Sequence, residues 1–145
     1  MKSRLTAIGR RRLSGVVLVA VLALVAAGAS QGSPTPSTVK SPIYNHRDDC
    51  TNDPAKHPIG TATFTRNKKN ILTVKVVLHG ADPGHWDLGL FTGDCSTFFE
   101  LGNFNVNANG EGSKVGTVDI TGYGNTFFAD PTSQLYDNET DIVKV

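Results

Sequence analysis

The sequence predicts an all-β fold, an antiparallel sandwich of about seven short strands, and three observations support that prediction. From residue 59 onward, apolar residues alternate with polar ones, which is the period of a half-buried strand. Gly, Asn, Asp and Pro interrupt this alternation about every 8–12 residues, as turns do in sandwiches. The chain after residue 29 has no capped segment with helical spacing. A closed barrel is the alternative that the same pattern allows.

Two predicted strands open the domain as a hairpin. Residues 61–66 alternate and end at the polar turn 67–70. In the strand that follows, 71–79, four apolar residues share one face, namely Leu72, Val74, Val76 and Leu78. The segment 80–84 contains Gly and Pro and breaks the chain before the next strand.

The remaining strands follow at short intervals. Trp86, Leu88 and Leu90 alternate with Asp87, Gly89 and Phe91, so we expect the first three side chains to be buried together. Strands are expected from about Leu101 to Val106 and from Val115 to Thr121. A second hairpin turn, 107–112, is expected between them because Asn-Gly suits positive φ. Segments 126–129 and 141–145 supply the last two strands.

The first 29 residues have the pattern of a cleaved signal peptide. Basic residues, namely Lys2, Arg4, Arg10, Arg11 and Arg12, precede an unbroken run of Val, Leu and Ala at 16–27. The small-x-small site Ala27-Gly28-Ala29 follows, so we expect the mature protein to begin near Ser30. The run is shorter than the roughly 20 residues that a membrane-spanning helix needs. We favour the general secretory route over the twin-arginine route.

Residues 30–58 are predicted to be a Ser/Pro/Thr-rich linker with an irregular lead-in, and residues 59–145 the sandwich domain. The linker has almost nothing apolar to bury, so we expect a flexible tether. Its composition is also typical of exported segments that carry sugar. Asn138-Glu139-Thr140 matches the N-glycosylation sequence.

Signal cleavage changes the charge of the protein. The full chain has 14 Lys and Arg against 13 Asp and Glu, a formal net charge of +1. Loss of the five basic residues in 1–29 leaves nine against 13, a net charge of −4. This argues against nucleic acid as a partner, because phosphate binding needs a basic face.

Cys50 and Cys95 are expected to form a disulfide, because a cysteine pair in a small exported domain is usually oxidised. Closing this loop stabilises the fold by about 4 kcal/mol at most, through the entropy of the unfolded chain. Two free thiols or a soft-metal site are the alternatives.

The sequence contains no catalytic or cofactor-binding constellation. It lacks Gly-x-Ser-x-Gly, and Cys95 is expected to be oxidised, so we predict neither an enzyme nor a cofactor. Four histidines lie among aspartates, but their spacing matches no zinc or copper signature. His79 and His85 flank one loop and are the candidates for a metal site, whereas surface histidines are the simpler expectation.

Neighbouring aromatic residues are the best indication of a binding surface. Phe98-Phe99 and Phe127-Phe128 are adjacent pairs, so on a strand one member of each pair points away from the core. With Tyr123 they form a candidate exposed patch. The competing interpretation, which we favour, places both pairs in loops over the sandwich ends or on strands covered on both faces.

Segments 60–64, 72–84 and 101–104, followed by Asn107-Ala108-Asn109-Gly110, carry a distinctive strand-and-turn pattern. It resembles small bacterial secreted domains with immunoglobulin-like or chordin-like (CHRD) sandwiches. The resemblance covers roughly residues 60–121 and implies an immunoglobulin-like sandwich more than any one function.

Gly80, Pro83-Gly84 and Gly93-Asp94-Cys95 resemble part of another sandwich family, the copper/zinc superoxide dismutases. In that family two histidine ligands of copper precede Gly-Asp-Cys, and here those positions fall on Leu88 and Leu90. Leucine cannot ligate copper, and the zinc loop is also missing. The resemblance therefore implies a related fold without dismutase activity.

Together these observations predict a secreted, non-enzymatic β-sandwich with a binding or structural role outside the cell or in the cell envelope. The expected partner is an extracellular protein or glycan, with no membrane span after signal cleavage. The alternative is a secreted copper- or zinc-binding protein related to superoxide-dismutase-like sandwiches.

Overall fold

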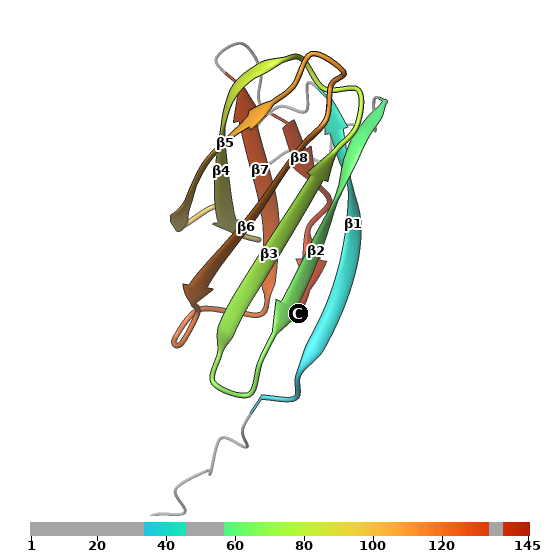
Figure 1. Cartoon of the computed structure of the whole chain (residues 1–145). Helices are drawn as coiled ribbons and strands as arrows, with labels where there is room; N and C mark the ends of the chain where they lie inside the picture. The colour runs from blue at the N-terminus through green and yellow to red at the C-terminus, as the bar shows by residue number, and fades with distance from the viewer. Residues whose placement is uncertain (1–33, 46–56, 134–137) are drawn as a thin grey trace, which may run out of the picture. The chain divides into compact units, whose positions relative to one another are not determined.

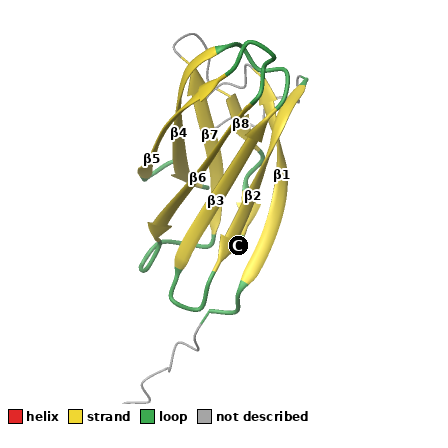
Figure 2. Cartoon of the chain, in the orientation of Figure 1, coloured by secondary structure: helices red, strands yellow, loops and turns green. Residues whose placement is uncertain are grey.

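Two antiparallel sheets pack face to face in the computed structural model, which describes residues 34–45, 57–133 and 138–145 (Figure 1). Every regular element among those residues is a strand, as Figure 2 shows. The antiparallel sandwich predicted from the sequence is therefore confirmed. Nine strands form in the described part of the chain: β1 (Ser37–Asn45), β2 (Pro58–Arg66), β3 (Ile71–Leu78), β4 (Gly84–Thr92), β5 (Phe98–Val106), β6 (Gly112–Asp119), β7 (Thr126–Ser133), β8 (Asn138–Thr140) and β9 (Val143–Lys144).

The five-stranded sheet has the order β6-β3-β2-β1-β8 and contains a strand within the predicted linker. β1 pairs with β2 from Ser37 to Tyr44 and with β8 near its end, and Ile43 is fully buried. The prediction of a linker and irregular lead-in is therefore wrong for residues 37–45. The segment escaped recognition because Ser41, a polar residue, occupies one of its core-facing positions.

β2 and β3 form the hairpin that the sequence predicts. Their pairing runs from Gly60↔Leu78 to Arg66↔Leu72, and residues 67–70 make the turn. Asn70 adopts a φ of 60°, a conformation that Asn tolerates better than most residues. Arg66 Nη2 donates a hydrogen bond of 2.6 Å to Asn70 Oδ1 and holds the turn against the end of β2.

The second predicted hairpin is wrong, because β5 and β6 lie in different sheets. The turn itself forms, with Gly110 N donating to Asn107 O at 2.9 Å and a φ of +78° at Gly110. Instead of reversing beside β5, the chain then crosses to the other sheet, where β6 pairs with β3. Turn chemistry is local, and it does not specify which sheet receives the next strand.

The four-stranded sheet has the order β5-β4-β7-β9 and contains a bulge between β4 and β5. Asp87 pairs with Asn103 and Gly89 pairs with Glu100, so β5 uses one more residue than β4 over this interval. Gly102 lies in the bulge with a φ of +91°, where a side chain is strained. The bulge keeps both Glu100 and Asn103 on the outer face.

Side chains from both sheets fill the space between them. Trp86, Leu88 and Leu90 are 2%, 1% and 0% exposed, which confirms that they share one core-facing stripe. They pack in one cluster with Phe64, Leu72, Val74, Val76, Leu78, Ile120 and Phe127. Burial of each leucine stabilises the fold by about 2 kcal/mol.

The predicted signal peptide (1–29), His46 and Cys50 lie outside the described residues. Within the described residues, no helix has the length and hydropathy needed to cross a membrane.

Candidate functional site

The outer face of the four-stranded sheet carries its side chains in rows across β5, β4 and β7. Because alternate residues of a strand point to opposite faces, the residues between Trp86, Leu88 and Leu90 face outward. The pairing of the strands sets which outward residues are neighbours. The rows are Asn103–Asp87–Thr132, Glu100–Gly89–Asp130 and Phe98–Phe91–Phe128.

Gly89 leaves room for the ring of Phe98 in the middle of this face. A Cβ on Gly89 would lie 3.1 Å from Cζ of Phe98 and nearer still to Cε2. The ring therefore leans across the glycine, while 53% of Phe98 stays exposed. Phe91 packs against it from the neighbouring strand, with ring centroids 4.9 Å apart. These contacts hold an apolar ring in place on a surface that faces solvent.

A groove with a volume of about 270 Å³ lies beside this ring. Three carboxylates line it, Asp87, Glu100 and Asp130, and each comes from a different strand. Thr132 Oγ1 donates to Asp130 Oδ1 at 2.9 Å and orients that carboxylate. The groove thus combines an aromatic wall with acidic groups from three neighbouring strands.

Acidic groups predominate on this face, although Lys144 faces outward on β9 and Nζ of Lys114 lies beside Gly102 at the β5 bulge. β4, β5 and β7 contain no Lys or Arg, so no basic residue of these three strands neutralises the carboxylates. A surface lined by charges of one sign attracts ions of the opposite sign. The groove therefore favours a positively charged group over an anion or another carboxylate.

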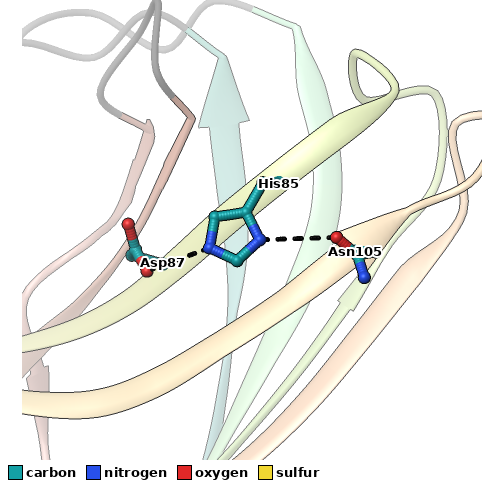
Figure 3. Close-up of polar contacts among 3 residues, drawn as sticks. All are labelled: His85, Asp87 and Asn105. Atoms are coloured by element: carbon teal, nitrogen blue, oxygen red, sulfur yellow. Dashed lines mark hydrogen bonds and ion pairs between the residues drawn. The ribbon is translucent and has the colours of Figure 1, made fainter.

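His85 lies at the end of the face, beyond the row that contains Asp87 (Figure 3). Its Nε2 is 3.8 Å from Asp87 Oδ1, and its Nδ1 is 3.4 Å from Asn105 Oδ1. The side chains of His85 and Asp87 are 50% and 67% exposed, so both remain open to solvent. Neither partner of the imidazole is a Ser, Thr or Cys, and this cluster therefore lacks the hydroxyl or thiol nucleophile that a triad for acyl transfer needs.

Of the aromatic residues that the sequence suggested as a binding surface, some are exposed and others are buried. Phe98 and Tyr123 are exposed, and Phe99 is half-buried against the core with its ring 5.0 Å from Tyr123. Phe127 is fully buried and Phe128 is 2% exposed, so an exposed patch that includes these two is wrong. Phe128 lies on the outer side of the sheet, where Phe91 stacks on it at 5.2 Å.

A second hollow of about 270 Å³ lies where β4 ends, lined by Thr92, Gly93, Asp94, Ser96 and residues 122–124 and 126. Asp94 Oδ1 accepts hydrogen bonds from Thr92 Oγ1 at 2.6 Å and from Ser96 Oγ at 2.8 Å. These bonds, the one from Thr92 above all, lower the pKa of Asp94 to about 2. The same bonds fold the loop back on β4, so the hollow follows from the turn geometry.

Cys95 sits in this loop with a φ of 59°. Its expected partner Cys50 lies outside the described residues, so the disulfide stays a prediction.

The two candidate metal ligands belong to different sheets. His79 follows β3 and His85 is part of β4, and both are exposed. Over residues 34–45, 57–133 and 138–145, no three His, Cys, Asp or Glu side chains come together as a metal site would require.

The glycosylation sequence at Asn138 is inaccessible in the folded domain. Asn138 is 0% exposed, and its Nδ2, the atom that would carry the sugar, donates to Pro131 O at 3.1 Å. A glycan at this position would require the end of the domain to open.

Sequence reasoning missed Gly89, Glu100 and Asp130 as parts of one site. The single usable signal was period-two alternation, which places Asp87, Gly89 and Phe91 opposite the apolar stripe of β4. The neighbours on β5 and β7 depend on strand order and on the bulge, which the sequence does not reveal.

No family model, no curated protein and no solved structure matches the chain.

Proposed function

We propose that this protein is an exported, non-enzymatic binding domain whose groove on the outer face of β5, β4 and β7 holds a positively charged group of a partner. The observation that carries the proposal is the ring of Phe98, which is 53% exposed and lies beside three carboxylates. An ammonium or guanidinium group can stack on such a ring while it pairs with carboxylates. Lysine and arginine side chains of an extracellular partner are the expected ligands.

The strength of each contact sets the expected affinity. A cation on an exposed aromatic ring gains about 0.5–1 kcal/mol. An exposed ion pair adds about 0.2–1 kcal/mol. One cationic group in this groove therefore binds weakly, and a tight partner must present more than one such group or add contact area.

Export belongs to the same proposal and is supported by the signal-like pattern of residues 1–29 and by the pair Cys50 and Cys95. Mass spectrometry of the secreted protein should find Ser30 at or near the new N-terminus. Peptide mapping without reductant should find Cys50 linked to Cys95. An intact Met1 in the secreted protein, or two thiols that alkylate freely, would contradict this part.

The groove is tested by titrating agmatine, a guanidinium compound without a carboxylate, into the exported protein. We expect saturable binding that weakens roughly two- to fivefold in Phe98→Ala and in Glu100→Gln. Ile142→Ala is a matched control, because Ile142 is an exposed apolar residue, 43% exposed, outside the groove, and its loss should leave binding unchanged. The proposal is refuted if neither groove substitution lowers the affinity for agmatine, or if agmatine does not bind at all.

A further inference from the structure

We infer that the partner is a second copy of this chain, which presents the outer face of its five-stranded sheet to the groove. The inference rests on the proposed function, because it names the source of the positive charge. It is carried by a match between two rows of side chains, one on each outer face of the sandwich.

The basic row crosses the five-stranded sheet. Pairing aligns Lys40 on β1, Thr63 on β2 and Lys75 on β3 side by side, and Val115 on β6 continues the row. All four face outward, because their neighbours along the strands face the core. Lys40 and Lys75 are exposed, and no ion pair joins either of them to a carboxylate within the described residues.

The acidic row has the same spacing. Glu100 and Asp130 flank Gly89, just as Lys40 and Lys75 flank Thr63. In both rows the two charges are separated by two strand spacings, which is about 9–10 Å. Two lysines of one copy can therefore reach two carboxylates of another at the same time.

Apolar groups accompany the charges on both faces. Val115, 54% exposed, ends the basic row, and Phe98, 53% exposed, lies beside the acidic row. These are two of the four large apolar side chains most exposed in the described residues. Contact between the two faces would place both in a partly dry interface, flanked by the ion pairs.

Such a contact joins unlike faces of two identical molecules. A bound pair still offers one free acidic face, on one copy, and one free basic face, on the other, so growth does not close on itself and gives open-ended stacks. A patch of three strands by about eight residues measures on the order of 14 by 26 Å. Contact over such a patch buries roughly 700 Å² in total, which is below the roughly 1,200–2,000 Å² of standard specific interfaces, so the stacks should be weak and reversible.

The first test is sedimentation velocity of the exported protein over a hundredfold range of concentration at low salt. We expect the mean sedimentation coefficient to rise with concentration, and to return to that of the monomer when salt is raised to about 0.5 M, because salt screens exposed charges. A coefficient that stays constant over the range overturns the inference.

The second test uses charge reversal on one row at a time. Lys75→Glu and Glu100→Lys should each reduce association at least tenfold when studied alone. Lys75 can face either Glu100 or Asp130, so Lys75→Glu is mixed in equal amounts with Glu100→Lys and, separately, with Asp130→Lys. One of the two mixtures should restore association, because opposite charges then face each other in both contacts between unlike variants. Lys68→Glu and Glu111→Lys are the matched controls, since both positions are exposed turn residues outside the rows. Failure of both mixtures to associate overturns the inference even where circular dichroism shows all variants folded.

Agmatine binding distinguishes failure of this inference from failure of the proposed function. Lys75→Glu leaves its own groove intact and should bind agmatine as the original protein does. If agmatine binds in the groove and no self-association occurs, the groove stands and the second copy is ruled out as partner. If agmatine does not bind, the proposed function fails as well.

Discussion

The two faces of strand β4 are built from neighbouring residues and have opposite roles. The inner face presents Trp86, Leu88 and Leu90 to the core, where none is more than 2% exposed. The outer face presents Asp87, Gly89 and Phe91 to the groove and to the rings beside it. One face is apolar and closely packed, whereas the other combines a carboxylate, a glycine and an aromatic ring.

This difference shows how the strand can support a binding surface without weakening the fold. The inner residues supply most of the burial energy of the strand, about 2 kcal/mol for each leucine. The outer residues therefore need not be apolar, and they can be of the residue types that bind a ligand. Substitutions on the inner face should change stability first, and substitutions on the outer face should change binding first.

The largest effect is expected from truncation on the inner face. Leu90→Ala should lower the free energy of unfolding by about 2–5 kcal/mol, because a fully buried side chain leaves a cavity. Urea unfolding followed by tryptophan fluorescence measures this. Glu100→Gln, an outer-face change, is the matched control and should stay within about 0.5 kcal/mol of the original protein. Equal losses of unfolding free energy in Leu90→Ala and Glu100→Gln would contradict the claim that the inner face of β4 determines stability and the outer face does not.

A smaller effect on stability, but a clear one on binding, is expected from Gly89→Ala. The new Cβ would overlap the Phe98 ring, which is half-exposed and can swing aside. We expect unfolding free energy to change by no more than about 1 kcal/mol, because removing a strand glycine offsets part of the strain. Agmatine affinity should fall as far as in Phe98→Ala. Unchanged affinity would show that the position of the ring does not matter.

The smallest effect concerns the loop where β4 ends. Hydrogen bonds from Thr92 and Ser96 lower the pKa of Asp94 from 3.8 to about 2 in the fold. The folded state therefore binds the proton more weakly, so this carboxylate stabilises the fold above pH 3.8 and loses that contribution as pH falls toward about 2. Asp94→Asn should have a lower free energy of unfolding than the original protein at pH 6. In acid unfolding, this difference between the two proteins should become smaller as the pH falls from 3.8 toward about 2. A difference in unfolding free energy that does not change with pH would contradict this role of Asp94.

Those parts of the fold that depend on local pattern were predictable from the sequence. Alternation located β2, β3 and β4, and it placed Leu88 and Leu90 in the core. β1 was missed because Ser41 interrupts its core-facing apolar residues. The crossing from β5 to β6 was missed because the turn at 107–110 forms equally well in a hairpin or between sheets.

The site was less predictable than the fold. The aromatic pairs pointed to Phe98, but the same reasoning included Phe127 and Phe128, which are buried. Sequence alone could not tell that Phe91 covers one side of Phe128. Glu100 and Asp130 lie 30 positions apart and meet across Gly89 only through strand order and the β5 bulge. Long-range pairing of this kind leaves no periodic signal.

The most direct test of the binding surface is to map it on the exported, isotope-labelled protein by NMR during titration with agmatine. At low protein concentration and moderate salt, self-association should not interfere. We expect the backbone amide shifts to move most at Asp87, Gly89, Phe98, Glu100 and Asp130, and to stay unchanged at Lys40 and Lys75 on the other sheet. Shifts that concentrate on β1, β2 and β3, or at the Asp94 loop, would contradict the assignment of the binding surface to the outer face of β4 and its neighbours.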